Sequence, residues 1–170
     1  VTGATSGLGQ AAASQLAELG ARVILVGRNP DKAEATRREI VAATGNDNVV
    51  VALADLSLLA DVRKLARKLL ETEPRIHVLV NNAGVYDDAP MAGMRADQWN
   101  HVIAVSLGGF FNVTQPLLLP MIGTRWGRII TISSVSIAPR PCSAFSPTRR
   151  CVSASRCGCG CSCAASTRFA

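Results

Sequence analysis

Short apolar runs alternate along the first 134 residues with longer stretches in which apolar residues recur at helical spacing. The apolar runs predict strands at residues 22–27, 49–54, 76–80 and 128–133. Val1 and Thr2 read as the end of an earlier strand whose start is missing. Helices fill the intervals, so the chain predicts an α/β fold: a doubly wound parallel sheet of the Rossmann type, truncated at its first and last strands.

Apolar spacing predicts the faces of two of the helices. A first helix over residues 7–19 has its apolar residues at near-helical spacing, with Gly20 as its stop, and these residues are Leu8, Ala12, Leu16 and Leu19. A later helix follows the strand at 49–54. Its inner face is expected to hold Leu59, Val62, Leu65, Ala66 and Leu69.

Local end signals predict the limits of the other two helices. Asn29 followed by Pro30 combines a side-chain cap with proline at the first helical position, and Gly45 marks the end of that helix. A longer helix is predicted over roughly residues 97–115. Pro116 and Pro120 are expected to kink or end it.

Charge and cysteine divide the chain near residue 140. All 12 acidic residues precede residue 98, while all six cysteines lie between Cys142 and Cys163. Residues 1–139 carry 13 of the 18 basic residues, so the excess positive charge belongs to the tail, and no clustered basic face predicts nucleic-acid binding. The cysteine-free part is typical of a reduced, cytoplasmic protein.

No targeting segment or membrane span is expected from the sequence. The longest apolar candidate, near residues 117–122, is broken by Pro120, and no apolar run approaches the roughly 20 residues of a membrane helix. No basic segment followed by an apolar one opens the chain, which predicts no secretory signal. The chain begins at Val1 without Met, which suggests a fragment.

A glycine-rich segment follows the first strand end. Residues 2–9 read Thr-Gly-Ala-Thr-Ser-Gly-Leu-Gly between that strand and the first helix. Gly3 permits a tight turn, while Gly7 and Gly9 let the backbone approach a pyrophosphate at the N-terminus of the helix. An ordinary glycine-rich turn is the alternative interpretation.

Three more motifs follow the later strands in order. They are Asp55-Leu56, then Asn81-Asn82-Ala83-Gly84, then Ile132-Ser133-Ser134. Together with the glycine-rich segment, they make residues 1–138 resemble the short-chain dehydrogenases/reductases. The stretch from Trp99 to Val135 is most similar to the 3-oxoacyl-[acyl-carrier-protein] reductases of that family.

The resemblance implies a nicotinamide dinucleotide cofactor. The implied cofactor-binding residues are Gly3, Thr5, Ser6, Gly7, Leu8, Gly9, Arg28, Asp55, Leu56, Asn81, Asn82, Ala83 and Gly84. Asp55 stands where the family's aspartate contacts the adenine ring. Arg28 follows the strand at 22–27, where an acidic residue would bind the ribose 2′-hydroxyl of NAD. An arginine there pairs with a 2′-phosphate, which favours NADP(H) over NAD(H).

The resemblance implies a catalytic set that is incomplete here. Ser134 matches the serine that orients the substrate carbonyl, and Ser106 stands at the family's asparagine position. The tyrosine and lysine of the Tyr-x-x-x-Lys pair are absent, with Pro147 and Cys151 in their places. The implied reaction is NADP(H)-dependent reduction of a small or carrier-bound 3-oxoacyl substrate, and this chain is expected to be inactive. A catalytically dead nucleotide-binding or interaction module is the alternative.

The tail at 139–170 is rich in Cys, Ser and Arg and is predicted to lack regular elements. Three interpretations stay open: an out-of-frame translation, a disordered linker, and a metal–thiolate site at Cys157-Gly-Cys159-Gly-Cys161-Ser-Cys163. The first is favoured, so no metal site is assigned. Neither His77 nor His101 has neighbours at metal-ligand spacing.

The resemblance implies a homo-oligomer in intact relatives, and this assembly is expected to be impaired here because truncation exposes the surfaces that it covers. Phe110, Phe111 and Leu117 of the long helix are expected to form a bare apolar patch that promotes association. The strand at 128–133 is expected to leave an open sheet edge.

Overall fold

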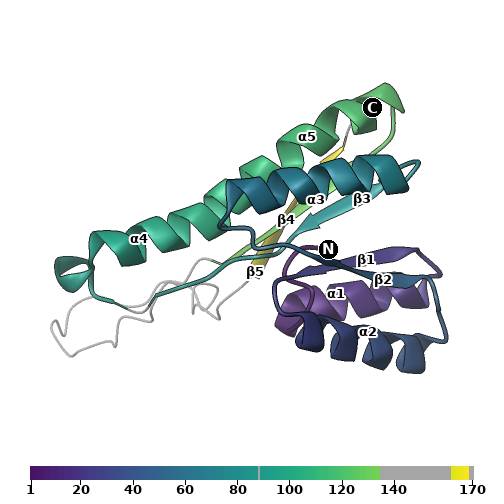
Figure 1. The fold of residues 1–170 in the computed structure, drawn as a ribbon, viewed down its shortest axis with the longest axis horizontal. Helices are drawn as coiled ribbons and strands as arrows, with labels where there is room; N and C mark the ends of the chain where they lie inside the picture. The colour runs from purple at the N-terminus through teal and green to yellow at the C-terminus, as the bar shows by residue number, and fades with distance from the viewer. Residues whose placement is uncertain (88, 135–161, 169–170) are drawn as a thin grey trace, which may run out of the picture.

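The structure is a computed structural model that describes residues 1–87, 89–134 and 162–168 (Figure 1). Its strands are β1 (Val23–Gly27), β2 (Val49–Leu53), β3 (Val78–Asn81), β4 (Arg128–Ser134) and β5 (Ser162–Arg168). Its helices are α1 (Gly7–Glu18), α2 (Pro30–Thr44), α3 (Leu59–Thr72), the 3-10 turn η1 (Met91–Gly93), α4 (Ala96–Ile103), the π-helical segment η2 (Ala104–Gly108) and α5 (Gly109–Gly123).

The parallel sheet is held together by the short strand remnant at the start of the chain. β1 pairs with β2 and β3 pairs with β4, both in parallel. Between the two pairs, Thr2 forms a parallel bridge with Val26, and its backbone N–H donates to the Val80 carbonyl oxygen at 2.9 Å. The alternation of strands and helices confirms the Rossmann-type α/β fold, and the remnant occupies the central position of the sheet.

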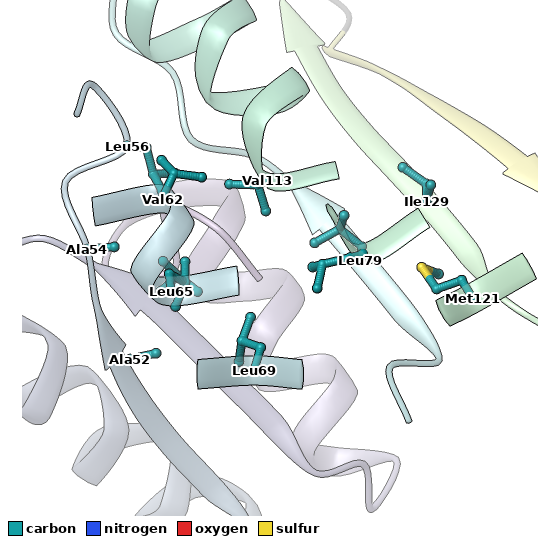
Figure 2. Close-up of a cluster of buried hydrophobic side chains, with 12 residues drawn as sticks. Ala52, Ala54, Leu56, Val62, Leu65, Leu69, Leu79, Val113, Met121 and Ile129 are labelled. Carbon is teal, nitrogen blue, oxygen red and sulfur yellow. The ribbon is translucent and has the colours of Figure 1, made fainter. Parts of the chain in front are cut away.

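Apolar side chains form one core on each side of the sheet. α1 and α2 cover one side, and α3 with α5 covers the other (Figure 1). Under α1 and α2, Ala13, Leu25 and Ile40 are buried together. Under α3 and α5, the core combines side chains of both helices with side chains of the strands. Figure 2 shows Leu65 of α3, Met121 of α5 and Leu79 of β3 among them. The fold therefore rests on aliphatic packing, in agreement with an aromatic content of only 4%.

The predicted ends of α2 are confirmed. The Asn29 side-chain oxygen accepts a hydrogen bond from the Lys32 backbone N–H at 2.9 Å, and Pro30 is the first helical residue. Gly45 ends the helix with a φ of 68°, a left-handed conformation that favours glycine.

The buried faces of α1 and α3 differ in part from the prediction. In α1 the buried residues are Gly9, Ala13 and Ala17, while Leu8 and Leu19 are exposed. Small residues on the inner face let the helix approach the sheet closely, which the apolar spacing alone did not reveal. In α3, the expected inner residues are buried except Leu59, which is 44% exposed at the first helical position.

The long helix does not end at residue 115 as predicted. α4, η2 and α5 run continuously from residue 96 to Gly123 with Pro116 and Pro120 inside α5. Val113, Leu117 and Met121 on its inner face are buried against α3 and the sheet. Burial of this face offsets the hydrogen bonds that the two prolines remove.

The outer face of the long helix is apolar. Phe110 and Phe111 are exposed as predicted, and the exposed fraction of Phe111 is 55%. Leu117 is buried, so the prediction that it belongs to the apolar patch is wrong. Residues Ala96–Gly123 contain an 18-residue window of mean hydropathy 1.6. By length and composition alone this helix could cross a membrane, a test that core helices of soluble proteins also pass. That window is 28% buried, and the inner face of the helix contributes Val113, Leu117 and Met121 to the core.

A strand in the tail pairs with the sheet edge, contrary to expectation. β5 runs antiparallel to β4 along its whole length, from Arg128 opposite Arg168 to Ser134 opposite Ser162. The prediction of an open edge beside β4 is therefore wrong. The prediction that the tail lacks regular elements is also wrong for residues 162–168, which form β5. Pairing with an exposed edge needs only backbone donors and acceptors, so no apolar pattern signals it. Pro147 and Cys151 lie outside the described residues.

Candidate functional site

Three glycines shape the loop between Thr2 and α1, each for a different reason. Gly3 has a φ of 60°, and a Cβ there would lie 2.9 Å from the Ala83 Cα. A Cβ at Gly9 would overlap both the Asn82 side-chain nitrogen and the Gly3 carbonyl oxygen. Gly7 has a φ of 54° with open space around it. Gly3 and Gly9 thus permit close packing, and Gly7 permits the turn.

The N-terminus of α1 is open. The Ser6 side chain makes no capping hydrogen bond, and Ser6, Gly7 and Leu8 are all exposed. The first N–H groups of a helix lack partners within the helix, and they carry a partial positive charge. This end of α1 is therefore suited to an anionic group.

Thr2 and Asn82 lock the glycine loop to the end of β3. The Thr2 hydroxyl oxygen accepts hydrogen bonds from the backbone N–H groups of Asn82, at 2.9 Å, and Ala83, at 3.0 Å. In return, the Asn82 side-chain amide donates to the Gly3 carbonyl oxygen at 3.0 Å and to that of Thr2 at 3.2 Å. Asn82 therefore acts on the loop as a positioning residue. The role of Thr2 escaped the sequence analysis, where the threonine before the first glycine was its only signal.

The two asparagines at the end of β3 have separate roles. The Asn81 side chain is 5% exposed and donates to the Thr114 hydroxyl at 3.0 Å, which ties β3 to α5. It does not reach the glycine loop, whereas Asn82 and Ala83 contact Thr2. Gly84 follows them and is exposed. The structure thus brings Asn82 and Ala83 to the loop and leaves Asn81 in contact with α5. A Cβ at Gly84 would instead lie 3.6 Å from the Ser106 hydroxyl oxygen.

Thr5 and Arg28 lie where the loop meets β1. A Cβ at Gly27 would come within 2.8 Å of the Thr5 methyl carbon, so glycine makes room for Thr5. Arg28 follows directly and is exposed. It forms no ion pair among residues 1–87, 89–134 and 162–168.

Asp55 is held rigidly after β2. Its carboxylate accepts hydrogen bonds from the Ser57 hydroxyl at 2.6 Å and the Ser57 backbone N–H at 2.9 Å. These hydrogen bonds, aided by the positive charges of Arg28 and His101, hold the pKa of the Asp55 carboxyl below its usual value. Leu56 points into the core (Figure 2). Its contribution to a ligand site would therefore come from the backbone.

Ser106 lies in the π-helical segment and contacts the strand end opposite. Its hydroxyl is 3.4 Å from both the backbone nitrogen and the carbonyl oxygen of Val85, accepting from the first and donating to the second. π-Helical turns often occur at functional sites. Ser134 ends β4, and the structure describes its backbone pairing only.

The site residues from β1, β2, β3 and Thr2 meet at one edge of the sheet, as expected for the carboxyl ends of parallel strands. An open helix N-terminus, a free arginine and a fixed carboxylate at this edge suit a ligand with phosphates and a nucleobase. Within the part of the chain that the structure describes, no three His, Cys, Asp or Glu residues gather as metal ligands. The cysteine motif at 157–163 lies outside it, except for the backbone of its last residues.

Comparison with known proteins decides the family. The model of the short chain dehydrogenase family matches residues 1–144. The chain belongs to the short-chain dehydrogenase family. The resemblance seen in the sequence motifs is thereby confirmed.

Members of the short-chain dehydrogenase family similar to this chain include reductases and dehydrogenases. The 3-oxoacyl-[acyl-carrier-protein] reductase FabG of Aquifex aeolicus is 39% identical over 79% of this chain and 54% of its own length. Retinol dehydrogenase 11 of Mus musculus is 40% identical over 79% of this chain and 42% of its own length. A metagenomic short-chain oxidoreductase, solved in complex with NADP, has a TM-score of 0.74 and 39% identity over 80% of this chain and 61% of that chain. This chain thus spans about half the length of these curated relatives.

Proposed function

We propose that this chain is the NADP(H)-binding portion of a short-chain dehydrogenase that reduces the carbonyl of 3-oxoacyl thioesters. The observation that carries the proposal is the Thr2–Asn82 lock, which fixes the glycine loop while the N-terminus of α1 stays open. The similarity to FabG supports the substrate class, and the NADP complex of the metagenomic relative supports the cofactor.

Each part of the dinucleotide has a partner in this proposal. The backbone N–H groups at Gly7, Leu8 and Gly9 receive the pyrophosphate at the start of α1. Arg28 pairs with the ribose 2′-phosphate, and Asp55 contacts the adenine ring. When bound, the dinucleotide supplies the hydride for carbonyl reduction.

The set of catalytic residues in this chain is incomplete. Ser134 orients the substrate carbonyl, and Ser106 holds the segment after β3. Pro147 and Cys151 provide neither the acidic phenol nor the ammonium of the family's Tyr-x-x-x-Lys pair. The function is therefore nucleotide binding without efficient turnover, which is also what a catalytically dead binding module would do. A cytoplasmic location and self-association through the exposed phenylalanines belong to the same proposal.

Turnover is expected to be absent while NADPH binding remains. Loss of a positioned general acid lowers a rate by about 10²–10⁴-fold. Binding is measured by NADPH fluorescence titration, and turnover by NADPH oxidation with a 3-oxoacyl thioester. A turnover rate equal to that of an intact family member would contradict the expected inactivity, and absence of NADPH binding would contradict the function itself.

Arg28→Ala is expected to weaken NADPH binding about tenfold and to leave NADH binding unchanged. The substitution removes a hydrogen bond to a charged group, typically about 1.5–3 kcal/mol, at an exposed position where screening reduces it. The two dissociation constants are measured by fluorescence titration. Arg63→Ala is the control, since Arg63 is exposed on α3. An equal loss for both nucleotides would exclude a selective 2′-phosphate contact.

A further inference from the structure

Basic side chains gather at the edge of the sheet opposite the candidate nucleotide site. Arg75 precedes β3, Arg125 precedes β4, and Arg128 is the first residue of β4. Because β3 and β4 are parallel, their amino ends meet at one edge of the sheet, whereas the glycine loop lies at the carboxyl ends. In Figure 1, α3 and α5 both end on this side of the molecule, where β3 begins.

Direct contacts join these basic residues into one surface. An Arg75 guanidinium nitrogen donates to the Thr124 carbonyl oxygen at 3.0 Å, which ties the start of β3 to the end of α5. The Arg128 guanidinium lies 5.2 Å from the centre of the Trp126 ring, and the His77 ring meets the same indole edge-on at 5.3 Å. We call this surface the basic edge, and it consists of Arg75, His77, Arg125, Trp126 and Arg128.

The positive charge of the basic edge is not paired with carboxylates. Residues 98–134 contain no aspartate or glutamate. Glu73, two positions before Arg75, is paired with Arg22 at 2.9 Å. None of the three arginines of the basic edge forms an ion pair in the part of the chain that the structure describes. The basic edge is therefore suited to a partner that carries negative charge.

Large apolar side chains continue the basic edge along α5. Leu119 and Ile122 are both exposed and lie one helical turn apart. The Arg125 backbone N–H donates to the Ile122 carbonyl oxygen at 2.9 Å, so the arginine follows this apolar pair directly. Basic side chains beside exposed leucine and tryptophan are typical of protein surfaces that lie on a membrane.

The backbone conformation of Arg125 is a separate sign of function at this surface. Its φ is 52°, and it is the only residue other than glycine with a positive φ in the described part of the chain. Glycine takes this conformation at the end of α2, where Gly45 has a φ of 68°. An arginine held in a conformation that favours glycine supports a functional role for its side chain.

We propose that the basic edge, together with Leu119 and Ile122, is a docking surface for a membrane of anionic lipids. The arginines attract the anionic headgroups, Trp126 lies at the level of the headgroups, and the apolar pair enters the acyl boundary. This surface goes beyond the proposed function, and it lies on a membrane without crossing it. A nucleic acid also attracts arginines, but exposed leucine and isoleucine side chains favour lipid as the partner.

The test is co-sedimentation of the full chain with lipid vesicles. Binding is expected to vesicles of phosphatidylcholine with phosphatidylserine, to weaken at high salt, and to be much weaker for phosphatidylcholine alone. Arg125→Gln is expected to weaken binding to the anionic vesicles about fivefold, the contribution of one basic residue near such a surface. Arg38→Gln is the control, because it removes the same charge from an exposed position of α2, on the other side of the sheet.

A second pair of variants tests the apolar part of the surface. Leu119→Ala is expected to weaken binding to the anionic vesicles about tenfold, because it removes most of a side chain that enters the acyl boundary. Leu19→Ala is the control, at an exposed position directly after α1. It is expected to leave vesicle binding unchanged, and circular dichroism shows whether each variant is folded.

The outcomes distinguish lipid from other partners of this surface. Binding that requires anionic lipid and is weakened by both Arg125→Gln and Leu119→Ala supports the inference. Absence of vesicle binding, equal binding to both compositions, or binding that neither substitution weakens would overturn it. Binding of single-stranded RNA that depends on Arg125 and not on Leu119 would assign the surface to nucleic acid and overturn it as well.

Two parallel measurements separate this inference from self-association and from the proposed function. Light scattering gives the oligomeric state, and a dimer that Leu119→Ala dissociates, without vesicle binding, would assign the surface to a second copy of the chain and overturn the inference. The affinity for NADPH is expected to be the same for Arg125→Gln and the unaltered chain, because Arg125 lies at the opposite edge of the sheet. Failure to bind NADPH would thus count against the proposed function alone.

Discussion

Gly9→Ala is expected to weaken NADPH binding strongly. A Cβ at this position would overlap the Asn82 side-chain nitrogen and the Gly3 carbonyl oxygen, which already form a hydrogen bond with each other. Neither atom can withdraw without breaking the lock between the glycine loop and β3. Overpacking of this kind costs about 1–3 kcal/mol, and here the displaced groups are those that shape the start of α1. We expect the affinity for NADPH to fall by about 5- to 150-fold, since every 1.4 kcal/mol is tenfold.

Two matched variants make the Gly9 experiment specific. Gly123→Ala, at the end of α5, has nothing within 4 Å of its added Cβ and is expected to bind NADPH normally. Asn82→Ala removes the two side-chain hydrogen bonds of the lock without adding volume and is expected to weaken binding as well. Fluorescence titration gives the affinities, and circular dichroism shows whether each variant is folded. A folded Gly9→Ala variant with unchanged affinity would show that the loop does not receive the nucleotide.

Local signals account for what the sequence predicted well. The Asn29 cap, Pro30 and the Gly45 stop act within a few residues, so their outcome does not depend on the rest of the fold. The strand ends that carry the glycine loop and Asp55 were likewise readable, because parallel strands bring their carboxyl ends to one edge.

Tertiary contacts account for what the sequence could not predict. The separate tasks of Asn81 and Asn82 depend on which one faces α5 and which one faces Thr2. The passage of the long helix through Pro116 depends on burial of Leu117 between α3 and the sheet. The pairing of β5 depends on a free backbone edge, which has no signature in side chains.

Leu117→Ala is expected to destabilise the fold strongly, whether or not nucleotide is bound. Leu117 is 1% exposed and belongs to the core between α3, α5 and the sheet. Truncating a buried leucine removes its transfer free energy and leaves a cavity, which together lower the free energy of unfolding by about 2–5 kcal/mol. Small domains have about 5–15 kcal/mol in total, so the variant should unfold at a much lower urea concentration. The same burial keeps α5 intact through its prolines, so helical circular dichroism should be lost in the same transition.

The control lies two residues along the same helix. Leu119→Ala changes the same side chain at a position that is 76% exposed, and it is expected to alter the free energy of unfolding by less than about 0.5 kcal/mol. Both variants keep the two prolines and the length of α5, so the difference between them isolates burial from helix propensity. Urea unfolding followed by circular dichroism measures both. Equal destabilisation by the two substitutions would mean that the outer apolar face is also buried in solution, as it would be if the chain associates through that face.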